Sequence, residues 1–422
     1  MGDNGCNFVA DERQMTNKQA AIKVIQHLQR NGFEALLAGG CVRDMLLGRQ
    51  ANDYDVATDA QPKDVMRLFR RTLKVGAKFG VVIVLTNNQQ VEVATFRTEG
   101  RYADGRHPSA VRFATAAEDA SRRDFTINGM FYDPLTDKVI DYVDGQADLA
   151  RQIVRTIGRP EERFAEDYLR MLRAVRFSTQ LGFAIEPATF LAICRLAGNI
   201  IKISGERIAI ELEGILVDPN RAAGMSMLVE TGLAEVIFPG FGREQAKLAV
   251  SMLGHLRKKV DFALALAELF AHCSTEFTLE KCRLLKPSRN QARHLKFLLA
   301  NRGKLLNDQM SLAELRMIVS EPYFWDLYEL QRAIQKAQAG GRRNLAPLVK
   351  LRKRIEALGD IELRPKPLLN GHDLMRLGAV PGPALGQLAQ EMYIAQLEGH
   401  LQTREQAEHW AKTWLQRHKI DK

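Results

Sequence analysis

The sequence predicts an α+β protein in which a mixed head of strands and helices is followed by a wholly helical remainder. Up to about residue 150, strand-like runs alternate with helical patterns. Beyond that point β signals nearly vanish, and helical periodicity dominates to the C-terminus. The chain has 422 residues, which exceeds one ordinary hydrophobic core, so we expect two or more domains.

The elements of the head follow from local patterns. Residues 16–30 carry apolar residues at helical spacing and stop at Asn31-Gly32, which is typical of a helix end. A short apolar strand, a glycine turn and a second helix come next, and Pro62 opens a third helix. Two β-branched runs on either side of a polar turn predict a strand pair. The expected ranges are 34–38 (strand), 42–47 (helix), 62–70 (helix), 81–85 (strand) and 91–96 (strand).

The stretch 36–44 (LLAGGCVRD) joins the first strand to the second helix through two glycines. Gly39 and Gly40 at such a turn let backbone N–H groups approach a phosphate, because no Cβ stands in the way. Arg43, in the first helical turn, would add a charge-assisted contact to the same anion. The pattern therefore predicts a phosphate-binding turn.

Ten residues further on, Asp53 and Asp55 alternate with apolar residues in strand-like sequence. At a period of two, both carboxylates point from one face. Two neighbouring carboxylates repel each other, and a divalent cation relieves that repulsion. Mg²⁺ suits hard oxygen ligands together with substrate phosphates, so we expect a Mg²⁺ site here.

Gly-Gly turns and Asp-x-Asp pairs both occur by chance on many surfaces. In this order and spacing, however, they resemble the head of the nucleotidyltransferase family that contains bacterial CCA-adding enzymes and poly(A) polymerases. The resemblance is strong from about residue 35 to 215 and weak in the tail. It implies a polymerase beta-like nucleotidyltransferase head followed by an all-helical neck, body and tail.

The resemblance extends to the strand 91–97 and the loop after it. Glu92 is a lone acid among apolar neighbours, either an edge-strand charge or, as the family implies, a third carboxylate beside the metal pair. Residues 100–113 (GRYADGRHPSAVRF) are typical of a mobile functional loop. The family's Asp-x-Arg-Arg-Pro pattern is matched there except that His107 replaces the second arginine.

The string 121–128 (SRRDFTIN) matches a second family signature almost letter for letter. A solvated charge run is the alternative explanation. Since adjacent arginines point in different directions on a regular element, we expect one of Arg122 and Arg123 to bind triphosphate and the other to pair with Asp124. The resemblance also implies a nucleotide-binding role for Asn128.

Residues 166–177 (EDYLRMLRAVRF) match a third signature, predicted to form one helix. Either the helix is a surface element braced by ion pairs, or it selects the nucleotide. The Asp167 carboxylate would accept a hydrogen bond from the exocyclic amine of a base, while Arg170 would donate a hydrogen bond to the ring. This arrangement suits cytosine and adenine and rejects uracil and guanine. The family uses these positions as a protein template. Arg173 joins this nucleotide-binding set, and Arg176 is assigned to phosphate or to structure.

Two further stretches carry weaker signals. Residues 205–212 (GERIAIEL) resemble the last family signature, a neck helix, which we interpret as structural support. His372-Asp373 resembles the pair of metal-dependent HD hydrolases, but no second spaced His/Asp pair accompanies it.

Composition fits a polyanionic partner in the cytoplasm. The net charge of +10 favours nucleic acid. Five cysteines without a CxxC pair indicate a reducing compartment and speak against a disulfide framework and a zinc site. No run approaches the ~20 apolar residues of a membrane span, so no membrane partner is expected.

The resemblance implies template-independent addition of C and A nucleotides from CTP and ATP to the tRNA 3′ end, with Mg²⁺ as cofactor. An A-adding or CC-adding partial enzyme, or a poly(A) polymerase, is the nearer alternative; a non-catalytic RNA-binding protein is the remote one. The loop disfavours a CC-adding enzyme, and the run 75–81 (VGAKFGV) looks like the CCA-adding pattern. The expected segments are 1–15 (disordered), 16–150 (catalytic head), 151–220 (neck), 221–345 (body) and 346–422 (tRNA-binding tail).

Overall fold

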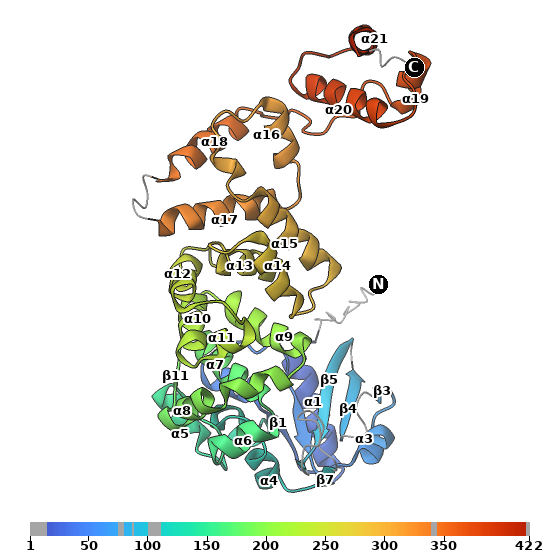
Figure 1. Ribbon diagram of the computed structural model, residues 1–422. Coiled ribbons are helices and arrows are strands. Elements are labelled where there is room, and N and C mark those ends of the chain that lie inside the picture. Colours follow the sequence, from blue (N-terminus) through green and yellow to red (C-terminus); the bar gives the residue numbers. More distant parts are fainter. Residues whose placement is uncertain (1–14, 75–79, 87, 100–110, 339–343, 419–422) are drawn as a thin grey trace, which may run out of the picture. The chain divides into compact units, whose positions relative to one another are not determined.

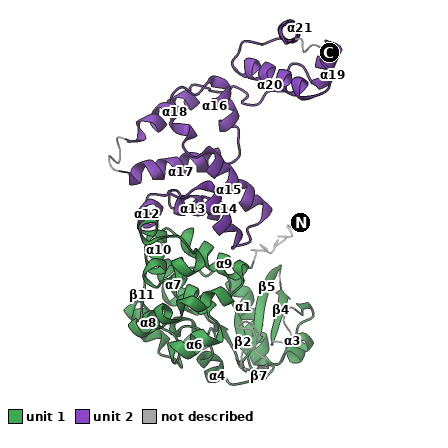
Figure 2. Cartoon of the chain, in the orientation of Figure 1, with its two compact units in different colours: residues 1–246 green, residues 247–422 purple. Residues whose placement is uncertain are grey.

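The computed structural model describes residues 15–74, 80–86, 88–99, 111–338 and 344–418. The chain divides into two compact units, residues 1–246 and 247–422 (Figure 2). This division is coarser than the five predicted segments, whose boundaries stay a prediction. The loop pattern at 104–108 and most of the run at 75–81 lie outside the described residues.

A mixed seven-stranded sheet forms the head of the first unit (Figure 1). Its order is β3-β4-β5-β2-β1-β8-β9, and only the β2–β5 pair is parallel. The strands are β1 Ala35–Ala38, β2 Val56–Thr58, β3 Thr72–Leu73, β4 Val81–Thr86, β5 Gln89–Thr95, β8 Phe131–Asp133 and β9 Lys138–Ile140. Two short pairs stand apart from the sheet: β6 Arg97–Glu99 with β7 Val111–Phe113, and β10 Ile153–Val154 with β11 Ala184–Ile185.

Helix α1 (Asn17–Arg30) shows why the head folds as predicted. Thr16 caps it in a reciprocal capping box with Gln19. One helical face, which includes Val24 and Leu28, is fully buried, and the helix packs against β1 and β5. Burial of each such side chain contributes roughly 1.5–3 kcal/mol, so the apolar face fixes the helix on the sheet.

The remaining helices of the first unit follow in chain order. They are α2 Gly40–Leu46, α3 Pro62–Leu68, α4 Ala116–Ser121, the 3₁₀ turn Thr126–Asn128, α5 Gly145–Arg151, α6 Pro160–Glu166, α7 Leu169–Leu181, α8 Pro187–Leu196, the 3₁₀ turn Ala197–Lys202, α9 Gly205–Leu216, α10 Arg221–Glu230 and α11 Leu233–Ile237. Helix α12 (Arg243–Leu253) crosses the boundary between the units. The chain beyond residue 150 is mostly helical, which confirms the predicted fold class, but the neck is not wholly helical, because it contains the short strands β10 and β11. The described residues after 185 contain no strand.

The second unit is made of helices (Figure 1). They are α13 Phe262–Leu269, α14 Thr275–Arg283, α15 Arg289–Asn301, the 3₁₀ turn Lys304–Leu306, α16 Leu312–Val319, α17 Phe324–Ala337, α18 Ala346–Glu356, α19 Gly371–Arg376, α20 Pro383–Leu397 and α21 Arg404–Arg417. Helix α13 is buried along its whole length and packs on α15 and α17. A separate apolar cluster, which includes Leu388 and Trp414, holds α19, α20 and α21 together.

Three local predictions need correction. Residues 166–177 do not form one helix, because α6 ends at Glu166 and α7 begins at Leu169. Asp53 and Asp55 precede β2 rather than lying in it. The last three residues of the predicted loop, Val111–Phe113, form a strand paired with β6.

A buried acid in α13 gives the first testable prediction. Glu268 is fully buried, and neither carboxylate oxygen has a hydrogen-bond partner among the described residues. Burial, reinforced by Glu329, raises the pKa of Glu268 well above its ordinary value. The folded state therefore binds more protons than the unfolded state, and stability falls as the pH rises from about 4.5. We expect Glu268→Met to stabilise the protein by about 1–3 kcal/mol near neutral pH.

Chemical denaturation at pH 5 and pH 8 measures this effect, and the gain should be larger at pH 8. Glu213→Met is the control, since Glu213 is exposed on α9. A loss of stability at pH 8 in Glu268→Met would contradict the prediction, because it would show that interactions in the folded protein outweigh the cost of burying the Glu268 carboxylate.

Candidate active site

A cavity of about 530 Å³ in the first unit gathers the predicted site residues. All of them line it except Asp53 and Arg176. The lining comes from β1, β2, β4, β5, α2, α7 and the turn after α4. The predicted lining residues are Gly39, Gly40, Arg43, Asp55, Glu92, Arg122, Arg123, Asn128, Asp167, Arg170 and Arg173. Residues separated by more than 130 positions in the sequence thus share one site.

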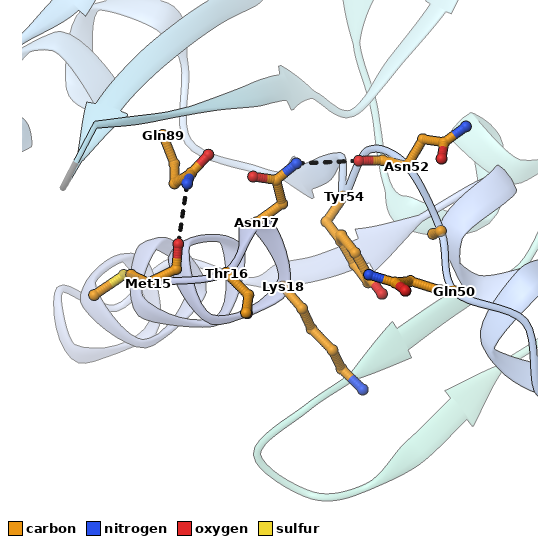
Figure 3. A pocket seen from close by; sticks show the side chains of 9 residues that line it. Met15, Thr16, Asn17, Lys18, Gln50, Asn52, Tyr54 and Gln89 are labelled. Atoms are coloured by element: carbon orange, nitrogen blue, oxygen red, sulfur yellow. Dashed lines mark hydrogen bonds between the residues drawn. The ribbon is translucent and has the colours of Figure 1, made fainter. Parts of the chain in front are cut away.

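A second cavity, of about 910 Å³, opens at the start of α1 and contains none of the predicted residues. Figure 3 shows Tyr54 and Lys18 beside it, together with Gln89, the first residue of β5. Asn17 Nδ2 donates to Asn52 O at 3.1 Å. Tyr54 lines this second cavity whereas its neighbour Asp55 lines the first. The segment before β2 therefore separates the two cavities.

The glycine turn has the backbone that the sequence predicts. Gly39 has φ +76°, a conformation that favours glycine, and a Cβ there would lie 2.9 Å from Arg123 Nη1. Helix α2 begins at the next residue. Arg43 is 9% exposed and donates to Asn128 Oδ1 at 2.7 Å and to Asp44 Oδ1 at 2.8 Å. The turn and its arginine are thus fixed beside the cavity.

The acidic side of the cavity is formed by Asp55 and Glu92. Asp55 directly precedes β2 and Glu92 lies in β5, and the parallel register Val56↔Val93 places these two residues beside each other. Although Asp55 is exposed to the cavity, poor hydration between its walls raises its pKa to about 6, and the charges of Glu92 and Asp53 add to that shift. Asp53 is exposed and lies outside the cavity lining.

The donor set fits a divalent cation. Carboxylate oxygens are the ligands that hard divalent ions prefer, and the mutual repulsion at Asp55 is what a bound cation relieves. The three carboxylates do not converge to within 4.8 Å of one another; in the described part of the chain only Asp261, His294 and Asp326 do so. In that group His294 Nδ1 lies 3.0 Å from Asp261 Oδ2, and Asp261 also caps α13, so the ion pair has a structural role.

The paired arginines differ from the prediction. Arg122 and Arg123 both pair with Asp119, at 2.7 and 2.9 Å, and Asp124 pairs with Arg173 instead. The prediction of divergent directions was wrong because α4 ends at Ser121 and the chain turns. Asp119 is 1% exposed; burial raises its pKa, but the guanidinium groups of Arg123 and Arg122 outweigh burial and hold it below the usual range.

A buried ion-pair network joins the head to α7 and α9. Arg173 donates to Asp124 Oδ2 at 2.6 Å and lies 3.5 Å from Glu211 Oε1. Burial raises the pKa of Asp124, but Arg173 and Asn128 outweigh it and lower the pKa below its usual value. Arg176 pairs with Glu211 at 2.5 Å, away from the cavity. Of the two roles considered for Arg176, this contact supports the structural one.

The helix break gives Asp167 its position. Asp167 has φ −151° and ψ 106°, and its Oδ1 accepts the Leu169 N–H at 3.0 Å. Its Oδ2 accepts from Arg207 Nη2 at 2.7 Å. Arg170 pairs with Glu166 across the break and donates to Arg163 O at 3.0 Å. Asp167 and Arg170 both line the cavity, so the two residues proposed to read the base lie at one site.

Sequence reasoning missed three residues at this site. Asp119 could have been found from its spacing of three and four residues to the arginine pair. Arg207 lies in a segment assigned only to structural support. Phe177, with Arg43 and Arg176 centred 5.3 and 4.2 Å from its ring, carries no signal beyond an apolar helix position. At the tail, Asp373 pairs with Arg376 and Arg404 and caps α19, and so serves as a structural acid.

Comparison with known proteins agrees with this geometry. Residues 35–155 match the family model of the poly A polymerase head domain, and residues 182–244 match the probable RNA and SrmB-binding site of polymerase A. The CCA-adding enzyme of Lacticaseibacillus paracasei is 36% identical over 372 residues, which cover 87% of this chain and 89% of that protein. This chain belongs to the CCA-adding enzyme family. The CCA-adding enzyme of Streptococcus gordonii is also 36% identical, over 91% of this chain and 94% of that protein.

Among solved structures, the CCA-adding enzyme of Bacillus stearothermophilus in complex with CTP superposes with a TM-score of 0.81. It is 28% identical and covers 97% of this chain and 100% of its own. The fold is therefore that of a CCA-adding enzyme, a nucleotidyltransferase of a family that depends on divalent metals. Within the described ranges, no helix combines the length and apolar character needed to cross a membrane.

The raised pKa of Asp55 predicts how cation binding depends on pH. Because the proton and the cation compete for the same carboxylate, the affinity for Mn²⁺ should be constant above about pH 6 and fall about tenfold per unit below it. Isothermal titration calorimetry between pH 5 and 8 measures this. Asp55→Asn should abolish the dependence, and Asp59→Asn, outside the cavity, should retain it. A pH-independent affinity in the unmodified protein would contradict the assignment.

Proposed function

We propose that this protein adds C and A nucleotides from CTP and ATP to the 3′ end of tRNA and releases pyrophosphate. The single observation that carries the proposal is one cavity lined both by the carboxylates of Asp55 and Glu92 and by the pair Asp167 and Arg170, in a chain of the CCA-adding family. That the superposed Bacillus stearothermophilus enzyme is a complex with CTP supports the nucleotide class.

Asp53 and Asp55 would hold Mg²⁺, with Glu92 beside them. When bound, such ions activate the terminal 3′-hydroxyl and stabilise the pyrophosphate leaving group. The chain's own residues orient the triphosphate: Gly39 and Gly40 offer backbone N–H groups, and Arg43, Arg122 and Arg123 offer guanidinium donors. Each of these arginines is already held by a carboxylate partner, so its geometry is set before the anion arrives.

Asp167 and Arg170 would select the base. Asp167 offers acceptors for an exocyclic amine, and Arg170 offers donors for a ring nitrogen or carbonyl. Cytosine and adenine present that order, whereas uracil and guanine present an oxygen beside an N–H. A mismatched base would leave buried polar groups without hydrogen-bond partners. Arg173, which lines the same wall, and Asn128, which bridges Arg43 and Asp124, support this arrangement.

The net charge of +10 supports tRNA as the polyanionic partner. The match of residues 182–244 to an RNA-binding region of polymerase A agrees with this. We place the protein in the cytoplasm, and the four described cysteines are free thiols, as a reducing compartment requires.

The alternatives are separated by one panel of substrates. tRNAs that end before CCA, after one C and after CC, each offered single nucleotides, distinguish full CCA addition from CC-only or A-only addition. A poly(A) polymerase would extend an unrelated RNA with ATP alone. A non-catalytic RNA-binding protein would bind and add nothing.

Removing either proposed metal ligand should stop nucleotide addition without weakening the binding of RNA. We expect Asp53→Ala and Asp55→Ala each to abolish incorporation of both CTP and ATP, because metal ligation serves every addition step. Affinity for tRNA should survive and fall with salt, because it comes from backbone contacts by basic residues. Incorporation assays and filter binding measure the two properties, and substantial turnover in either variant would remove that residue from the metal site.

Asp167→Ala should relax base choice rather than abolish catalysis. It removes the acceptor for the amine, whereas Arg170 can still donate to a carbonyl. We expect UTP to gain relative to CTP by about 1–3 kcal/mol, the cost of one buried unsatisfied group. Single-nucleotide incorporation of all four nucleotides on tRNA lacking CCA measures it. Wild-type selectivity in this variant would show that residues 166–177 have only a structural role, stabilised by ion pairs.

A further inference from the structure

We propose that Arg207 is a positioning residue that sets the selectivity of the active site by fixing the carboxylate of Asp167. The inference deepens the proposed function and rests on it. Its basis is the contact of Arg207 Nη2 with Asp167 Oδ2 at 2.7 Å, made from outside the cavity that Asp167 lines.

The need for such a residue follows from the helix break. A side chain within a helix is held by the packing of the helix, but Asp167 lies between α6 and α7 in extended backbone. Among the described residues, the other hydrogen bond to its carboxylate comes from the Leu169 N–H, at Oδ1. One hydrogen bond on one oxygen leaves the carboxylate free to rotate about it, and Arg207 on the second oxygen fixes the plane.

Arg207 suits this task by its placement. It lies in the first turn of α9, and its side chain is 22% exposed. It does not line the cavity, so it holds the carboxylate without being one of the residues that face the ligand space. Each carboxylate oxygen has a further acceptor site, so each keeps a lone pair for a ligand of the cavity that Asp167 lines.

The consequence for specificity is geometric. A fixed carboxylate presents its free lone pairs in one direction, where an exocyclic amine can donate and a carbonyl oxygen is repelled. A carboxylate that rotates can turn away from a carbonyl oxygen and cease to repel it. Loss of Arg207 should therefore weaken the rejection of uracil more than it weakens the use of cytosine.

The test is the ratio of kcat/KM for CTP to that for UTP on tRNA lacking CCA. We expect Arg207→Met, which keeps the length of the side chain, to lower the ratio at least tenfold. Arg207→Lys, which restores one donor, should recover part of it. Arg195→Met is the matched control, because Arg195 forms a similar pair with Glu161 (3.3 Å) outside the cavity and should leave the ratio unchanged.

A double-mutant cycle shows whether Arg207 acts through Asp167. In an Asp167→Ala background, Arg207→Met should change the ratio no further. An unchanged ratio in Arg207→Met, or an equal further loss in the double variant, would overturn the proposal. If Arg207→Met fails to fold, Arg207→Lys and Arg207→Gln keep the comparison. An unmodified protein that adds neither nucleotide would refute the proposed function instead, so the two failures are distinct.

Discussion

The active site depends on the ion pair between Asp124 and Arg173. Asp124 lies in the turn after α4, and Arg173 lies on α7, so this contact ties the head to the first long helix after it. The side chain of Arg173 is 34% exposed and that of Asp124 only 11%, so removing Arg173 would leave a poorly hydrated carboxylate without its compensating charge. The pair extends through Asn128 to Arg43 and through Glu211 to Arg176. One network therefore sets the distance between the glycine turn and α7.

The same principle orders the cationic wall of the cavity. Arg122 and Arg123 share Asp119, Arg170 has Glu166, and Arg43 has Asp44. A guanidinium carries five N–H donors, so a carboxylate partner holds it in place without using all of them. These arginines lose less conformational entropy when an anion binds than solvated ones would. The pKa of Asp55 is raised because the carboxylate is poorly hydrated and lies near Glu92 and Asp53, and the charge of Arg123 offsets only part of that shift.

Much of the head could be predicted because its patterns are local. The apolar face of α1 and the strand pair β4–β5 follow from periodicity, and Gly39 follows from a turn that needs positive φ. The break at Asp167 could not be predicted, since 166–177 reads as one amphipathic run and nothing in it disfavours a helix. The partners of the arginines were missed for a different reason. Asp119 lies only three and four residues before the arginine pair and was overlooked, whereas Arg207 reaches Asp167 through a tertiary contact across 40 residues of sequence.

The break at Asp167 also gives a structural basis for the proposed selection of a base by Asp167 and Arg170. In a continuous helix, successive side chains rotate by 100°, so residues 167 and 170 would keep a fixed offset on the helix surface. The break frees Asp167 from that offset, and its carboxylate is then held by Leu169 N and Arg207. Arg170 remains on α7 and is fixed by Glu166. Acceptor and donor are therefore positioned independently, which is what recognition of two bases of different size, cytosine and adenine, requires.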